Sequence, residues 1–137
     1  MIYPRISAAV LVLSLVSLLH SQEATGNRSV ATLGADGVQH MDITAGAYYF
    51  DPNVIVVKIN VPVEVAVKKA GGIIPHNMVL KAPEAGINIS VALSSKPTLV
   101  MFTPTKVGKY PFACTKRLLF FKSHKDRGMQ GIIEVIE

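Results

Sequence analysis

The residues of this chain that bind soft transition metals occur in an informative order. His76 comes first, and Cys114, His124 and Met129 follow within sixteen positions of one another. Two imidazoles, one thiolate and one thioether form the donor set of a mononuclear copper site with a trigonal plane of two histidines and a cysteine and a weak axial methionine. A rigid site of this kind lets a copper ion change charge with little movement of its ligands. The set therefore predicts one-electron transfer through a single copper ion.

Each of these residues has a simpler explanation when it is taken alone. A single histidine can be an ordinary solvent-facing side chain, a single methionine is more often core filler, and a single cysteine is usually a small buried hydrophobe. Their joint occurrence in this order favours the metal site. Gln130, the neighbour of Met129, is an alternative axial ligand because glutamine can also serve in that position.

The spacing of the last two ligands predicts the local structure that carries them. His124 and Met129 are five positions apart, which on a helix would separate their side chains by about 140° around the axis. They can share one ion only from a loop. Residues 107–113 form a typical strand pattern that delivers Cys114 at its end, and a last strand resumes at Gly131. The sequence thus predicts a loop of ligands at the rim of a sheet, completed by a histidine from another loop.

Short apolar runs separated by turn formers extend over most of the chain. Apolar and polar residues alternate clearly in residues 61–67 and 87–91, which indicates strands with one buried face. No sequence segment after residue 21 keeps the apolar period of a helix. The pattern predicts an all-β Greek-key sandwich or barrel of seven to nine strands. The expected strands are residues 38–43, 48–50, 54–59, 61–67, 77–80, 87–91, 98–102, 109–113 and 131–136.

The length and composition of the chain exclude several classes of protein. It has 137 residues, of which 50% are hydrophobic and 17% are charged, and its formal net charge is +5. This length suits one domain, and the composition is too apolar for a disordered chain. Short apolar runs exclude a protein with many membrane spans. With one cysteine the chain forms no internal disulfide, so Cys114 is a metal ligand, a buried thiol, a nucleophile or half of an intermolecular disulfide.

The N-terminus has the features of an export signal. Arg5 precedes an apolar stretch at residues 6–19, and small and polar residues follow. We therefore predict a signal peptide at residues 1–21, a flexible segment at residues 22–37 and a folded domain at residues 38–137. The alternative is a retained anchor, for which the stretch is short, since a span needs about 20 apolar residues. We expect a mature protein without a membrane span, in the periplasm or otherwise outside the cytoplasm.

Residues 38–137 resemble the cupredoxins, the family of small blue-copper β-sandwiches that includes plastocyanin and azurin. Three motifs carry the resemblance. They are Pro75-His76-Asn77, the Gly-x-Tyr-x-Phe-x-Cys run at residues 108–114, and His124-x4-Met129 followed by a terminal strand.

The resemblance implies a role for each matching residue. His76 would be the upstream histidine ligand of one copper ion per chain, Cys114 the thiolate, His124 the second histidine near the surface, and Met129 the axial donor. Asn77 would hold the cysteine loop in place. The resemblance also implies that electrons enter and leave through the imidazole of His124.

The chain departs from the family in the length of one loop. Cupredoxins usually have only a few residues between the cysteine and the second histidine, whereas nine separate Cys114 from His124 here. Residues 118–121 of this loop, Leu-Leu-Phe-Phe, are large and apolar. They either cover the copper and exclude water or form an exposed docking patch. We expect cover, because four contiguous exposed apolar residues are unusual on a soluble monomer.

Positive charge is concentrated in the same part of the chain. A positive field beside a redox centre raises encounter rates with an acidic partner, and salt weakens the effect. The sequence therefore predicts a redox partner protein with an acidic docking face; the alternative is an ordinary solvated lysine-rich turn. Nucleic-acid binding is not expected, because the aromatic residues are placed for apolar packing rather than base stacking. One acidic residue, Asp126, stands among the basic residues Lys116, Arg117, Lys122, Lys125 and Arg127.

Other metal functions suit the sequence less well. Zinc accepts cysteine and histidine, but a thioether is a poor fourth ligand and no carboxylate is placed for acid-base catalysis. A binuclear copper centre needs a second cysteine and a multicopper oxidase needs His-x-His pairs, and the sequence contains neither. We therefore expect no enzyme. The strongest competitor is a copper storage, delivery or sensing protein that uses the same ligands for ion exchange.

Overall fold

The computed structural model describes residues 26–137. The predicted signal peptide at residues 1–21 lies outside the described residues. Among the residues that are described, no helix is long and apolar enough to cross a membrane.

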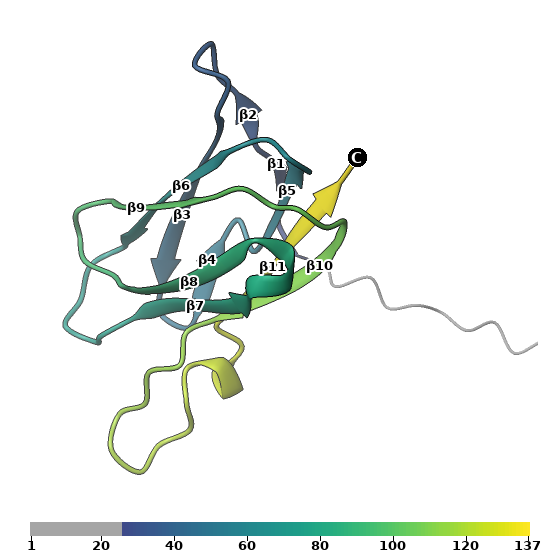
Figure 1. Cartoon of the computed structure of the whole chain (residues 1–137). Helices are drawn as coiled ribbons and strands as arrows, with labels where there is room; N and C mark the ends of the chain where they lie inside the picture. Colours follow the sequence, from purple (N-terminus) through teal and green to yellow (C-terminus); the bar gives the residue numbers. More distant parts are fainter. Residues whose placement is uncertain (1–25) are drawn as a thin grey trace, which may run out of the picture.

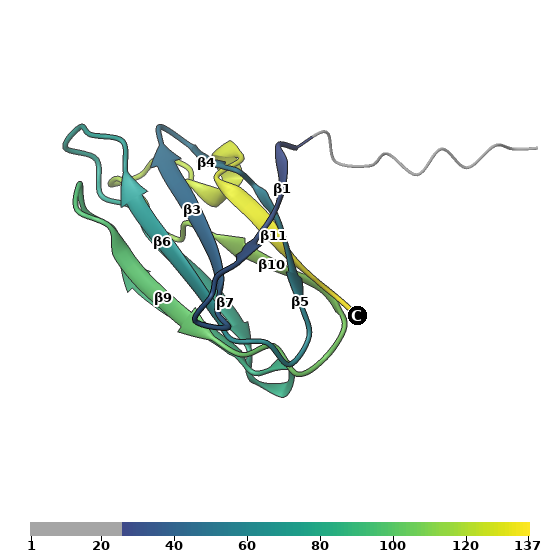
Figure 2. The ribbon, with the colours of Figure 1, turned by 90° about the horizontal axis from the view of Figure 1, so that it is seen from above.

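Eleven strands in the described part of the chain form two sheets that face each other (Figures 1 and 2). The larger sheet has the order β1-β5-β11-β10-β7-β8, and the smaller has the order β2-β3-β6-β9 with β4 paired to β3. Both sheets are mixed, because β5 pairs in parallel with β1 and β11, and β3 pairs in parallel with β6. The predicted all-β sandwich is confirmed, but its described residues form eleven strands and not seven to nine, because β1 and β2 precede the nine expected strands. The larger sheet contains β1 (Arg28–Val30), β5 (Val54–Lys58), β11 (Gln130–Ile136), β10 (Gly108–Ala113), β7 (Asn77–Ala82) and β8 (Ile87–Ala92); the smaller contains β2 (Thr32–Leu33), β3 (Gln39–Gly46), β4 (Tyr49–Asp51), β6 (Val63–Lys69) and β9 (Thr98–Phe102).

The alternation in the sequence determines which face of each strand is buried. On β6, Val63, Val65 and Val67 are completely buried, and on β8 Ile87 is completely buried and Ile89 is 2% exposed. These side chains meet between the two sheets in one core cluster. Burying each of them contributes roughly 1.5–3 kcal/mol relative to exposure, so the pattern that predicted the strands also holds the sheets together.

Two short strands lie within residues 22–37, where the sequence predicted a flexible segment. β1 pairs in parallel with β5, and β2 pairs antiparallel with β3. Their apolar side chains Val30 and Leu33 are 64% and 63% exposed. The two strands are held by backbone hydrogen bonds, which any residue type can make. Their sequence therefore shows no alternation of apolar and polar residues, and for this reason the pattern did not predict them.

A buried glutamine ties the two sheets together at the end of β3 remote from the ligand loops. Gln39 is 4% exposed. Its side-chain amide donates to the carbonyls of Lys58 (3.0 Å) and Val61 (3.1 Å) and accepts from the Lys58 amide (2.7 Å). Because a buried amide group is stable only when its hydrogen bonds are made, these contacts fix β3 against β5.

Candidate metal centre

Strand pairing brings the predicted ligands to one end of the sandwich. His76 immediately precedes β7 and Cys114 immediately follows β10. β7 and β10 are antiparallel neighbours, so the beginning of one lies beside the end of the other. β11 pairs antiparallel with β10 and begins opposite its end, which places Met129, the residue before β11, beside Cys114. The same hydrogen-bond ladder thus positions three of the four predicted ligands.

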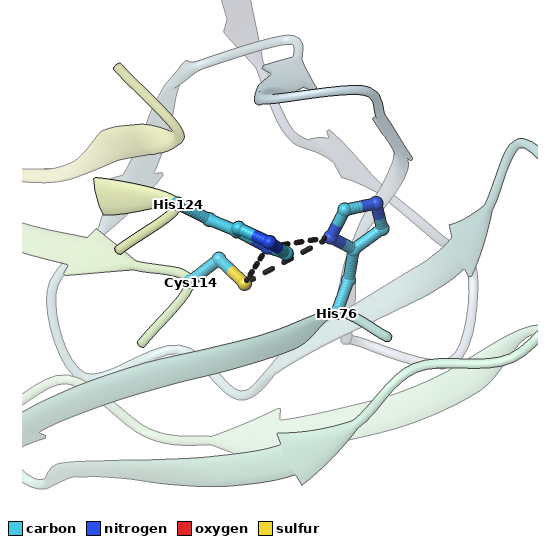
Figure 3. Close-up of side chains that lie close together, drawn as sticks. All are labelled: His76, Cys114 and His124. Carbon is cyan, nitrogen blue, oxygen red and sulfur yellow. Dashed lines mark hydrogen bonds between the residues drawn. The ribbon is translucent and has the colours of Figure 1, made fainter. Parts of the chain in front are cut away.

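Three donor atoms converge within this end of the molecule, as Figure 3 shows. The Nδ1 atoms of His76 and His124 are 3.1 Å apart, and Sγ of Cys114 lies 3.4 Å from Nδ1 of His124 and 3.9 Å from Nδ1 of His76. An ion bonded to nitrogen at about 2.0 Å and to sulfur at about 2.3 Å places such donors about 3.3 to 3.8 Å apart. The three side chains therefore already have nearly the spacing that a common ion requires.

Both histidines of the cluster are buried. His76 is 4% exposed and His124 is 2% exposed. Burial lowers the pKa of His76, and the positive charges of His124 and Lys69 lower it further. Burial also lowers the pKa of His124, with a further contribution from the positive charge of Arg127. The lowered pKa values favour the neutral imidazole, the form in which a histidine nitrogen binds a metal ion.

The cysteine is held by the residue that the resemblance singled out. The backbone amide of Asn77 donates to Sγ of Cys114 at 3.5 Å. Its side chain donates to Oγ1 of Thr115 at 2.9 Å and accepts from the amide of Thr115 at 2.8 Å. The expectation that Asn77 holds the cysteine loop is confirmed. Cys114 itself is completely buried.

A tight turn brings His124 and Met129 together. The 3-10 helix η2 (Lys125–Arg127) follows His124, and Gly128 closes it with a left-handed φ of 96°. The amide of Met129 donates to the carbonyl of His124 at 2.9 Å, and the carbonyl of Met129 accepts from the amide of Cys114 at 3.0 Å. Met129 is thus bonded through its backbone to two of the predicted ligands, and its side chain is completely buried in the same cluster as Cys114.

The alternative axial ligand does not join this cluster. Gln130 is exposed and begins β11, opposite Ala113. Since alternate residues of a strand point to opposite faces, the burial of Met129 and Gly131 leaves Gln130 directed away from the core. Of the two axial candidates, only Met129 has a buried side chain.

The nine-residue loop does not cover the site, and our expectation on this point was wrong. Leu118, Leu119, Phe120 and Phe121 are 49%, 74%, 100% and 55% exposed. The amide of His124 donates across the base of the loop to the carbonyl of Lys116 at 2.8 Å. This bond closes the loop on itself and directs its tip away from the sheets (Figure 1).

A tyrosine outside the nine-residue loop, not predicted from the sequence, contacts the second histidine. The rings of Tyr48 and His124 meet edge to face with centroids 5.1 Å apart, and the guanidinium of Arg127 lies 4.8 Å from the Tyr48 centroid. Tyr48 lies in the turn between β3 and β4 with a φ of 63°, unusual for a residue with a side chain. The resemblance implied a histidine near the surface, whereas His124 is buried and its ring contacts Tyr48.

A lysine fixes the segment that precedes His76. Nζ of Lys69 donates to the carbonyls of Gly72 (2.8 Å) and Ile74 (3.3 Å). These bonds satisfy backbone groups in a turn that is otherwise free of regular pairing. Nothing in the local sequence marks Lys69, because its partners are carbonyl groups that any residues would supply.

Comparison with known proteins extends these observations. No family model and no curated protein matches the chain. Among solved structures, the chain is similar to the metal-binding domain of the Cu(I)-exporting P-type ATPase CopA of Streptococcus pneumoniae, determined with Cu(I). The two are 21% identical with a TM-score of 0.59, over 80% of this chain and 96% of that one.

Two further solved structures show the same fold. Auracyanin A, a blue copper protein from Chloroflexus aurantiacus, is 22% identical over 73% of this chain and all of its own, with a TM-score of 0.56. The periplasmic domain of subunit II of cytochrome oxidase (CoxB) of Bradyrhizobium japonicum is 20% identical over 78% of this chain and 86% of its own, with a TM-score of 0.53. The chain therefore has a cupredoxin-like fold, and its buried cluster of His76, Cys114, His124 and Met129 fits a single copper site.

Proposed function

We propose that this protein is an exported mononuclear copper protein that carries one electron at a time. The observation that carries the proposal is the convergence of Nδ1 of His76, Nδ1 of His124 and Sγ of Cys114 within 4.8 Å of one another, in the interior of a cupredoxin-like sandwich. Met129 is proposed as the fourth, axial ligand. A copper ion bound there would supply a Cu(II)/Cu(I) couple.

The chain's own residues make the site suitable for electron transfer. The donor atoms are buried away from water, and a neutral imidazole releases no proton when it binds a metal ion. Strands β7, β10 and β11 hold three of the ligands through a shared hydrogen-bond ladder, so the donor atoms are kept in place whatever the charge of the ion. Electrons are proposed to pass through His124, whose ring contacts Tyr48, the aromatic ring on which the guanidinium of Arg127 lies.

Location and partner remain parts of the proposal. The charged, apolar and small-residue pattern of residues 1–21 supports export to the periplasm or another extracytoplasmic compartment. Exposed basic side chains beside the site support a redox partner with an acidic docking face. These side chains are Lys116, Arg117, Lys122, Lys125 and Arg127.

Copper storage, delivery or sensing is the second candidate function. The likeness to a metal-binding domain of a Cu(I) exporter favours it, because the same fold serves ion handling there. The complete burial of Cys114 and Met129 opposes it, since ion exchange requires ligands that an incoming chelator can reach. We further propose that the chain is an electron carrier rather than an enzyme, which the likeness of its fold to auracyanin A, a blue copper protein, supports.

Copper reconstitution tests the proposed function. The chain is expected to bind one Cu(II) and to develop the visible absorption and narrow EPR hyperfine splitting of a copper thiolate. Cys114→Ser is expected to abolish the colour while the circular dichroism of the β-sandwich stays the same. Thr115→Ser is the matched control, which keeps both the thiolate and the hydroxyl group. A coloured Cys114→Ser variant would contradict the assignment.

A chelator competition separates the two candidate functions. A Cu(I) chelator is added to a mixture of the reduced and oxidised copper-loaded protein while electron self-exchange between the two forms is measured by NMR line broadening. A carrier is expected to keep its copper over many electron exchanges. Rapid transfer of copper to the chelator together with slow electron exchange would assign the site to storage or delivery.

A further inference from the structure

The loop of residues 115–123 is closed by one backbone hydrogen bond at its base and another at its tip. At its base the amide of His124 donates to the carbonyl of Lys116 at 2.8 Å. At its tip the amide of Phe121 donates to the carbonyl of Leu118 at 3.0 Å, and Leu119 adopts a left-handed φ of 50°. The tip is therefore a closed turn that presents four large apolar side chains, residues 118–121.

The two central side chains of the apolar tip are the most available to a binding partner. Phe120 is 100% exposed and Leu119 is 74% exposed, so neither side chain packs appreciably on the protein's own surface. In Figure 1 the loop between β10 and β11 extends beyond the ends of the strands. A convex apolar tip of this kind exposes more hydrocarbon than the isolated surface leucines of ordinary proteins.

Positive charge flanks the tip on both sides. Lys116 and Arg117 precede it and Lys122 follows it, and all three are exposed. The nearest carboxylate in the sequence, Asp126, is engaged by Ser123, whose hydroxyl donates to it. Apolar side chains at the tip with cations immediately behind them match the layers of an anionic bilayer, in which the acyl region lies beneath the phosphate groups.

We propose that residues 116–122 form an insertion loop that binds the surface of an anionic lipid membrane. Residues 118–121 enter the interface between headgroups and acyl chains, and Lys116, Arg117 and Lys122 contact the lipid phosphates. A protein partner would need a hollow shaped to receive Phe120, whereas a bilayer accepts a convex apolar tip of any shape. Lys116, Arg117 and Lys122 would then serve the membrane and not an acidic redox partner, whose docking is left to Lys125 and Arg127 on η2.

The consequence of this surface is a fixed orientation of the metal centre. Phe121 and His124 are three positions apart, and the bond between His124 and Lys116 closes the base of the insertion loop. Insertion of the tip therefore brings the proposed electron-transfer ligand close to the membrane surface. The inference goes beyond electron transfer and is tested without copper, so its failure and the failure of the proposed function are distinguishable.

A single introduced fluorophore tests the insertion. The chain has no tryptophan, so Phe120→Trp places one indole at the tip, and Leu99→Trp places one at a half-exposed apolar position of β9 as the control. Vesicles of phosphatidylcholine with phosphatidylglycerol are expected to shift the emission of Phe120→Trp to shorter wavelength and to protect it from iodide. Phosphatidylcholine alone should do neither, and the Leu99→Trp emission should not change with either vesicle. If the apolar residues 6–19 bind vesicles, they do so in both variants. Such binding alone would not shift the emission of the indole in Phe120→Trp.

Vesicle sedimentation with matched variants tests the apolar tip and the flanking basic residues separately. Leu119→Ser with Phe120→Ser is expected to lower partitioning into the anionic vesicles about tenfold, whereas Leu99→Ser with Met101→Ser on β9 leaves it unchanged. Each charge removed by Lys116→Ser or Arg117→Ser is expected to lower partitioning about fivefold. Lys58→Ser and Lys109→Ser, which remove exposed lysines elsewhere, are the controls.

Three results would overturn the proposal. The first is an unchanged emission of Phe120→Trp with anionic vesicles. The second is equal partitioning of the tip variant and the unmodified chain. The third is a chain that does not insert into vesicles but binds immobilised polyglutamate equally well with and without the tip substitutions. That result would assign the loop to an acidic protein partner instead.

Discussion

Asn77 and Thr115 are joined by two hydrogen bonds, one in each direction. Oδ1 of Asn77 accepts from the Thr115 amide at 2.8 Å, and Nδ2 of Asn77 donates to Oγ1 of Thr115 at 2.9 Å. Asn77 directly follows His76 and Thr115 directly follows Cys114. The pair therefore locks the two ligand-bearing segments to each other through their immediate neighbours.

Removing this lock is expected to weaken both the fold and the site. Asn77→Ala should lower the free energy of unfolding by about 1 to 3 kcal/mol, since each of two hydrogen bonds contributes about 0.5–1.5 kcal/mol. Thr115→Val keeps the bond to the amide and should cost about half as much. Chemical denaturation of the metal-free protein measures both. Equal losses for the two variants would show that the asparagine does not act through this pair.

Met129→Leu tests the axial ligand. The substitution conserves volume, so it should change the free energy of unfolding by less than about 1.5 kcal/mol. Loss of the thioether donor removes stabilisation of Cu(II) and should raise the reduction potential, measured by protein-film voltammetry. Gln130→Leu is the control and should leave the potential unchanged because Gln130 is exposed. The opposite result for the two variants would make Gln130 the axial ligand.

Basic residues on η2 are expected to control the rate of electron exchange with charged reagents. Lys125→Gln with Arg127→Gln should slow oxidation by anionic hexacyanoferrate(III) several-fold at low ionic strength and flatten its salt dependence. Oxidation by a cationic cobalt complex should become faster. Lys58→Gln with Lys109→Gln removes the same charge elsewhere and serves as the control. Identical rates for both pairs would remove η2 as the docking position.

His40 should make stability depend on pH. Its Nε2 lies 3.0 Å from Asp36 and its Nδ1 lies 3.3 Å from Glu64. The hydrogen bond to Asp36, supported by the charges of both carboxylates, raises the pKa of His40 above its ordinary value of 6.5. The folded state thus binds the proton more tightly than the unfolded state. This stabilisation is complete below pH 6.5 and is lost as the pH rises through the folded-state pKa.

Comparison with His40→Gln isolates this contribution. The metal-free chain should exceed the variant in free energy of unfolding by more at mildly acidic pH than at pH values well above 6.5. The difference cancels the contribution of the buried His76 and His124, whose lowered pKa values act in the opposite direction. A difference that does not vary with pH would show that the two carboxylates do not stabilise the charged imidazole.

The interior strands and the donor set could be predicted because each depends on local sequence. Alternation in residues 61–67 and 87–91 follows from the geometry of a half-buried strand, whatever lies opposite. Cys114, His124 and Met129 are close in sequence, and the spacing of His124 and Met129 by itself excludes a helix between them. Two imidazoles, a thiolate and a thioether are chemically specific, so their identity pointed to copper without any distance.

The rest depended on contacts between distant parts of the chain. Tyr48 contacts His124 across 76 positions of sequence, and Lys69 binds carbonyl groups that carry no side-chain signal. β1 and β2 are held by backbone pairing with exposed side chains. The apolar tip at residues 118–121 looked like cover from composition alone, and it is exposed because a backbone bond at the base of the loop turns it outward.

By itself, the sequence determined the all-β class, the buried faces of the strands and the residue types available to a metal ion, because these follow from periodicity and donor chemistry. Only the tertiary structure decided that three donor atoms lie within 4.8 Å of one another, that Met129 rather than Gln130 is buried beside them, and that the long loop faces outward. Convergence and exposure depend on the pairing of strands far apart in the chain, which short-range patterns do not encode.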